Sequence, residues 1–148
     1  MSIFPTKILL ASDGSSEAEL AARTAADLAN STNSELHLIC VPDSTYDSVD
    51  LGYSYETYEV AIRAVKEETQ KVLDEQVQKV EEAEGTVKEA HPRIDQRPDQ
   101  AIIHLAEELD VGLIVMGSRG LGGVRRALMG SISEFVVRHA HCPVLITR

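Results

Sequence analysis

The chain has 148 residues, a length that suits one domain able to build its own hydrophobic core. Hydrophobic residues make up 43% and charged residues 26%, which is ordinary globular usage, and the formal net charge is -10. This acidic excess repels nucleic-acid phosphates and anionic membranes, and no Lys/Arg-rich run offsets it, so we expect neither partner. The chain contains no apolar run long enough to cross a bilayer and no recognisable signal peptide; we therefore expect a cytoplasmic protein.

The two cysteines support the same compartment. Cys40 and Cys142 both lie among apolar residues in strand-like segments. A reducing cytosol keeps such residues as thiols, and a free cysteine commonly behaves as a small hydrophobic residue. We expect two buried structural thiols.

The first third of the chain predicts a strand, a helix and a second strand. Residues 7–12 form a near-continuous apolar run, which is typical of a strand buried on both faces. An alanine-rich stretch from 16 to about 30 predicts a helix that can lie close on a sheet. Residues 35–41 predict the second strand, which Pro42 ends.

The middle of the chain predicts a long loop and a long helix. Residues 43 to about 57 are polar, and all four tyrosines lie in or beside this stretch: Tyr46, Tyr53, Tyr55 and Tyr58. Apolar residues recur every three or four positions from 58 to 83, which indicates an amphipathic helix. Gly85 stands where a helix C-cap is expected.

The second half continues the alternation of strands and helices. Expected elements are a short strand at 86–90, a helix opening at Pro98, a buried strand at 112–116, a helix from 131 to about 139, and a strand at 144–147. Strict alternation predicts a doubly wound α/β fold with a parallel sheet covered on both faces. In such sheets ligands bind beyond the carboxyl ends of the strands.

Residues 117–131, which we call the glycine segment, lie between a predicted strand and the last predicted helix. Glycines allow backbone amides to approach a phosphate closely, and a helix amino end favours an anion. Between 117 and 133 there are three arginines and no carboxylate, within a strongly acidic protein. The pattern predicts a phosphate site. Ser131 and Glu134 also have the spacing of a capping box, which needs no ligand, and the two interpretations are compatible.

Motifs along the whole chain resemble the ATP-binding members of the universal stress protein family. They are the spacing Gly117-x2-Gly120-x9-Gly130-Ser131, Asp13-Gly14-Ser15 after the first strand, and His141-Cys142-Pro143-Val144 before the last. The resemblance implies one domain over 1–148 with a three-layer, Rossmann-like architecture related to the adenine nucleotide alpha hydrolases. It also implies a five-stranded parallel sheet of strand order 3-2-1-4-5.

The resemblance also implies a nucleotide site. It places Asp13 at the ribose or as a Mg²⁺ ligand, and the backbone of Val41 at adenine. Asp13 on its own is equally typical of a turn in Asp-Gly-Ser. Ala11 stands where some ATP-binding members carry proline, a departure on the adenine side. The complete set of residues implied to bind the nucleotide is Ala11, Asp13, Val41, Met116, Gly117, Arg119, Gly120, Gly130, Ser131 and Ile132.

The sequence favours binding of ATP, AMP or ADP, with Mg²⁺, over rapid turnover. The glycine segment lacks the lysine of a P-loop, and it contains no Asp, Glu or His to orient a water molecule. We expect no catalytic residue. His139, His141 and Cys142 suggest a metal site but lack further ligands at the usual spacing. The other histidines, at 37, 91 and 104, are scattered along the chain and indicate no site.

Three functions remain open at this point. The first is an ATP-binding regulatory protein of the stress response, whose nucleotide state changes a surface that faces a protein partner. The resemblance implies a homodimer that pairs through the last strand, Val144 to Arg148. The second is a slow ATPase or an autophosphorylating phosphotransferase. The third is a dimeric interaction protein without nucleotide, against which the intact glycine spacing argues.

Overall fold

The computed structural model describes residues 7–12, 16–41, 55–94, 97–118 and 130–148. Its strands are β1 (Lys7–Ser12), β2 (Glu35–Cys40), β3 (Val87–Pro92), β4 (Leu113–Gly117) and β5 (Val144–Thr147). Its helices are α1 (Ser16–Thr32), α2 (Tyr55–Glu82), α3 (Pro98–Leu109) and α4 (Ser131–His139). The strands form one parallel sheet in the order β3-β2-β1-β4-β5, which confirms the expected topology.

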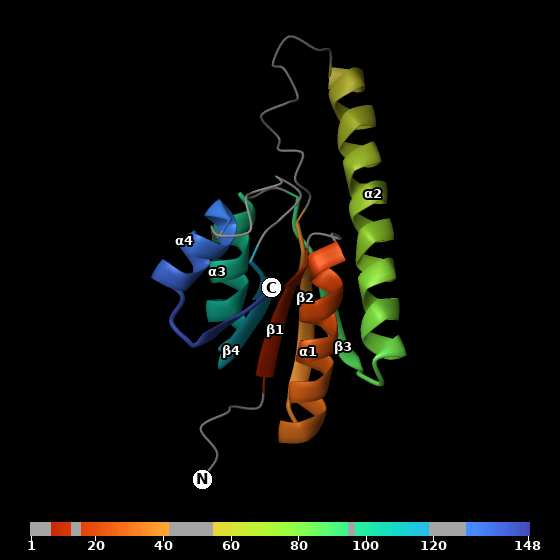
Figure 1. The fold of residues 1–148 in the computed structure, drawn as a ribbon. Helices are drawn as coiled ribbons and strands as arrows, with labels where there is room; N and C mark the ends of the chain where they lie inside the picture. The colour runs from red at the N-terminus through yellow and green to blue at the C-terminus, as the bar shows by residue number, and fades with distance from the viewer. Residues whose placement is uncertain (1–6, 13–15, 42–54, 95–96, 119–129) are drawn as a thin grey trace.

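The sheet lies between two layers of helices. Helices α1 and α2 cover one face, and α3 and α4 cover the other (Figure 1). From β1 the chain adds β2 and β3 on one side, then returns to add β4 and β5 on the other side. The winding therefore reverses between β1 and β4, where this class of sheet opens its ligand crevice.

Most of the expected elements are confirmed, with shifts of a few residues at their ends. Helix α2 begins at Tyr55, so residues 55–57, which were expected in the polar loop, are helical. Of that loop, residues 43–54, with Tyr46 and Tyr53, lie outside the described part of the chain. Strand β3 runs on to Pro92 instead of ending near residue 90.

Alternating side chains of the buried strands build two cores. In β1, Ile8 and Leu10 pack with the fully buried alanines of α1, whose small side chains let the helix lie close on the sheet. Leu9 points to the other face and packs in the core that α3 and α4 cover. An all-apolar strand sequence follows from burial on both faces.

The end of α2 differs from expectation in the role of its glycine. The left-handed residue is Glu84, with φ of 65°, whereas Gly85 donates its N–H to Val80 O at 2.9 Å. A Cβ built on Gly85 would lie 2.7 Å from Ala26 Cβ and 2.8 Å from Val80 Cγ1. Gly85 is therefore required by close packing of α2 against α1, not by a left-handed cap.

Neither cysteine forms a disulfide bond, and only one of the two is fully buried. Cys40 lies in the core beneath α1 and α2, as expected. Cys142 is half-buried and precedes β5 instead of lying within a strand, so the expectation of a second buried strand thiol is wrong. Among the described helices, none has the length and apolar character needed to cross a membrane.

Candidate functional site

The site forms where β1 and β4 end at the centre of the sheet. Ala11 pairs in register with Met116, and Ser12 pairs with Cys40 on the other side. Both Ala11 and Met116 are buried and belong to the core on the α3 and α4 face. The carboxyl ends of these two strands thus mark the point where winding reverses, which is where sheets of this class bind their ligands.

Two hydrogen bonds tie the amino end of α4 to the end of β4, and a third ties the end of β4 to β5. The Gly130 N–H donates to Ser118 O at 2.7 Å, so the two ends of the glycine segment meet. Ser118 N–H in turn donates to Thr147 O of β5 at 2.9 Å. The Ser133 hydroxyl donates to Gly117 O at 2.8 Å. The first turn of α4 is therefore held firmly beside the crevice.

The amino end of α4 has no side-chain cap. Its N-cap is Gly130, with φ of -64° and ψ of 156°, and no side-chain hydrogen bond closes the first turn. The capping box predicted for Ser131 and Glu134 is wrong, because Ser131 is already the first helical residue. The Glu134 carboxylate pairs instead with Arg138 at 2.8 Å.

The uncapped turn offers hydrogen-bond donors to an anion. The first helical bond at this end runs from Glu134 N–H to Gly130 O at 2.9 Å. The amides of residues 131–133 precede it and have no acceptor within the helix. Together with the helix dipole, such amides favour a phosphate or another anion. The donor set therefore fits a phosphate group.

The structure brings together most of the residues that the sequence nominated. Ala11, Val41 and Met116 are buried in one core on the same face of the sheet, and Gly130 is buried at the amino end of α4. Gly117 and Ile132 are partly exposed, and Ser131 is exposed. Three further residues of the set lie outside the described part of the chain: Asp13, Arg119 and Gly120.

Ser133 is a positioning residue that the sequence reasoning missed. It is 3% exposed, and its Oγ lies within hydrogen-bond reach of both Gly117 O and Ser118 O, at 2.8 and 3.3 Å. A signal was present, because Ser133 stands three residues before the buried Val136 and so shares its helix face. A serine on a buried face needs a hydrogen-bond partner.

The histidines near the last strand engage backbone carbonyl groups in the described structure. His139 Nδ1 lies 2.8 Å from Phe135 O, one turn earlier in α4. His141 Nε2 lies 3.0 Å from Val111 O. These contacts account for both imidazoles without a metal ion, and the described residues lend the metal hypothesis at this place no support.

The sheet topology agrees with the comparisons to known proteins. The model of the universal stress protein family matches residues 5–148. The chain belongs to the universal stress protein family. A universal stress protein of Staphylococcus haemolyticus is 38% identical over 144 residues, which cover 95% of this chain and 83% of the relative.

Solved universal stress proteins share the fold. The UspA protein from Lactobacillus plantarum has a TM-score of 0.74 and 26% identity, with 97% of each chain covered. A universal stress protein crystallised in complex with cAMP has a TM-score of 0.73 and 22% identity, with 99% of each chain covered. At that identity the second likeness is one of fold alone.

Proposed function

We propose that this universal stress protein is a cytoplasmic regulatory protein of the stress response that binds an adenine nucleotide, ATP with Mg²⁺, at the carboxyl ends of β1 and β4. The observation that carries the proposal is the uncapped amino end of α4, with Gly130 at the N-cap beside the crevice. The resemblance of the glycine spacing to that of ATP-binding universal stress proteins supports an adenine nucleotide as the ligand class, and a universal stress protein of the same fold has been crystallised with cAMP. The absence of a disulfide bond between Cys40 and Cys142 suits a reducing compartment.

Each part of the nucleotide has a group to hold it. The amides that follow Gly130 and the exposed Ser131 hydroxyl would bind phosphate oxygens, with Arg119 and Gly120 completing the set. The backbone of Val41 would contact adenine, and Ala11, Met116, Gly117 and Ile132 would line the ribose and the phosphates. Asp13 would hold the Mg²⁺, since this ion prefers one or two carboxylates together with phosphates and water.

The proposal is of binding rather than turnover. The described residues of the nucleotide site are Ala11, Val41, Met116, Gly117, Gly130, Ser131 and Ile132, and none of these carries a carboxylate or an imidazole. The nearby Glu134 carboxylate is engaged by Arg138. General-base activation of water therefore has no group among these residues. The nucleotide would act through the surface it changes.

The proposed assembly is a homodimer that pairs through β5. This strand lies at one edge of the sheet, and Val144, Leu145 and Ile146 are only partly buried in the single chain. An apolar edge strand of this kind is suited to pairing with a second copy. A sedimentation mass of twice the 16.2 kDa of the chain would support the dimer, and a mass of 16.2 kDa would refute it.

The first experiment identifies the ligand directly. Nucleotide is released from the purified protein and analysed by mass, and ATP with Mg²⁺ is then titrated by calorimetry while ADP is monitored. Saturable binding with negligible ADP supports the regulatory protein. Steady ADP formation, or phosphate transferred to the chain, would replace it with the slow ATPase or the autophosphorylating enzyme. Absence of binding would leave the nucleotide-free dimer.

Gly130→Val tests the phosphate site itself. The φ and ψ of Gly130 are open to any L-residue, so the fold should survive, but the side chain would stand where a phosphate approaches the amides. Loss of two charge-assisted hydrogen bonds, about 1.5–3 kcal/mol each, would weaken ATP binding by about 100-fold or more.

Gly130→Ala is the matched control, because alanine caps a helix about as poorly as valine but is smaller. We expect calorimetry to give it a smaller loss of affinity than Gly130→Val. A folded Gly130→Val protein that binds ATP like the wild type would refute the assignment.

A further inference from the structure

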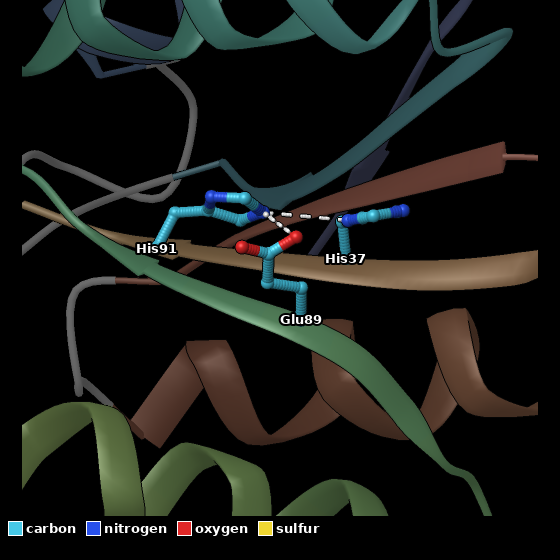
Figure 2. Close-up of side chains that lie close together, drawn as sticks. All are labelled: His37, Glu89 and His91. Atoms are coloured by element: carbon cyan, nitrogen blue, oxygen red, sulfur yellow. Dashed lines mark hydrogen bonds and ion pairs between the residues drawn. The ribbon is translucent and has the colours of Figure 1, made fainter.

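A second site, separate from the crevice, lies between strands β2 and β3. Figure 2 shows His37 on β2 with Glu89 and His91 on β3, their side chains standing together on the face opposite α1 and α2. His37 Nδ1 lies 3.3 Å from His91 Nε2, and the same His91 nitrogen lies 3.9 Å from a Glu89 carboxylate oxygen. One ligand atom from each residue lies within 4.8 Å of the others.

A register shift in the sheet creates this grouping. Leu36 pairs with Val87, but His37 pairs with Glu89, so β3 has one extra residue at this point. The shift places Glu89 directly opposite His37, and His91 then follows on the same face. Such bulges are rare between parallel strands, and where they occur they often re-aim a side chain at a functional site.

The spacing of the two imidazole nitrogens matches the requirement of a metal ion. In a tetrahedral zinc site with Zn–N bonds of about 2.0–2.1 Å, two ligand nitrogens lie about 3.3–3.4 Å apart. The observed separation is 3.3 Å. The Glu89 oxygen is slightly farther away, but its side chain is 65% exposed and free to move closer.

A second carboxylate stands behind the cluster. The other nitrogen of His37, Nε2, is buried and has no hydrogen-bond partner among the described residues. The nearest charged group is a Glu35 carboxylate oxygen at 3.5 Å, in reach of a small adjustment. Histidine ligands of metals commonly present their remaining N–H to a carboxylate in this way, which fixes the ring and raises its basicity.

The surroundings leave the imidazoles able to bind a cation. The side chains of His37 and His91 are 5% and 9% exposed, whereas Glu89 faces solvent and provides a path of entry. The Arg93 guanidinium, on the residue after the end of β3, lies 4.0 Å from the Glu108 carboxylate, which offsets its charge.

We propose that His37 Nδ1, His91 Nε2 and the Glu89 carboxylate form a zinc site, with water as the fourth ligand and Glu35 as a positioning residue. Two imidazoles with one carboxylate and one open position are a common zinc-binding set. A bound ion would fasten the edge strand β3 to β2. The proposal does not depend on nucleotide binding, because none of its four residues belongs to the proposed nucleotide site.

The test titrates Zn²⁺ into the full chain after treatment with a chelator, using a chromophoric chelator as competitor. We expect one Zn²⁺ per chain. Glu89→Gln should lower the zinc affinity by about tenfold or more, and His91→Asn should lower it further. Glu35→Gln should lower it by about tenfold, because it weakens the contact of residue 35 with His37 Nε2. The controls Glu81→Gln and His104→Asn remove an exposed carboxylate and an exposed imidazole elsewhere and should bind like the wild type.

A structural readout locates the ion. Zinc should shift the NMR signals of the His37 and His91 imidazole rings. It should also raise the melting temperature of the wild type but not that of Glu89→Gln. Unchanged imidazole signals, no binding at one ion per chain, or wild-type affinity in Glu89→Gln would overturn the proposal. The proposal would also be overturned if His141→Asn lost zinc binding while Glu89→Gln and His91→Asn kept it. Since the Glu89 side chain is exposed, Glu89→Gln should fold even if His91→Asn does not.

Discussion

Single alanine substitutions at Ser131 and Ser133 separate the binding surface of α4 from its anchor. The two serines stand two residues apart in the first turn, yet Ser131 is exposed and Ser133 is 3% exposed. Both substitutions bring a similar gain in helix propensity. Differences between the two variants in melting temperature and in nucleotide affinity therefore report the contact that each hydroxyl makes.

The magnitude for Ser133→Ala follows from its hydrogen bond. The hydroxyl donates at 2.8 Å to Gly117 O, and removal leaves this carbonyl, at the end of a central strand, without that donor. Loss of a buried hydrogen bond of this kind costs about 1–2 kcal/mol of unfolding free energy. For a domain of this size, the melting temperature should fall by about 2–8 °C. Ser131→Ala should leave the melting temperature nearly unchanged.

The nucleotide affinities should show the opposite order. Ser131→Ala removes a hydroxyl proposed to bind phosphate directly, and one charge-assisted hydrogen bond is worth about 1.5–3 kcal/mol, or about 10- to 150-fold in affinity. Ser133→Ala should weaken ATP binding less, because it only loosens the turn. Thermal denaturation and calorimetry on the same samples measure both effects. A Ser133→Ala protein with the melting temperature of the wild type would refute the role given to Ser133. A Ser131→Ala protein with wild-type affinity for ATP would refute the role given to Ser131.

Two further predictions test other parts of the structure. Gly85→Ala should lower the unfolding free energy by about 1–3 kcal/mol, because its Cβ would lie 2.7 Å from Ala26 Cβ. Urea denaturation measures this loss, and no loss would contradict the close packing of α1 and α2. Burial, and then the Asp110 carboxylate, raise the pKa of the Cys142 thiol. Because the thiolate is the reactive form, Cys142 should be alkylated more slowly at pH 8 in the folded chain than in urea. Asp110→Asn, which suits the left-handed φ of 52° at that position, should speed the reaction, and equal rates in folded and unfolded wild type would contradict the assignment.

The fold could be predicted because its elements obey local rules. Continuous apolar runs such as residues 7–12 belong to strands buried on both faces, and the alanines of α1 mark a helix that lies close on a sheet. Alternation of the two element types then allows few topologies. Element ends were less accurate, as at Tyr55, because the tertiary contacts that decide them are not local.

The elements that flank the candidate nucleotide site were predicted from the sequence, but the structure at the start of α4 was not. Spacing of glycines located the junction between β4 and α4, yet the same local pattern suggested a capping box at Ser131 and Glu134 that does not form. The choice between a capped and an uncapped helix end depends on where the first turn starts. Here the bonds from Gly130 N–H to Ser118 O and from the Ser133 hydroxyl to Gly117 O hold that turn, and both span more than ten residues of sequence.

The histidine cluster shows why a second site could not be predicted from the same sequence. His37 and His91 are 54 residues apart, and an unbroken register from Leu36 and Val87 would pair His37 with Lys88. Glu89 and His91 would then lie on the opposite face from His37, because side chains alternate along a strand. One extra residue in β3 reverses that outcome and places two imidazoles and a carboxylate together. A ligand set of this kind is a property of strand register, which the spacing of residues along the chain does not contain.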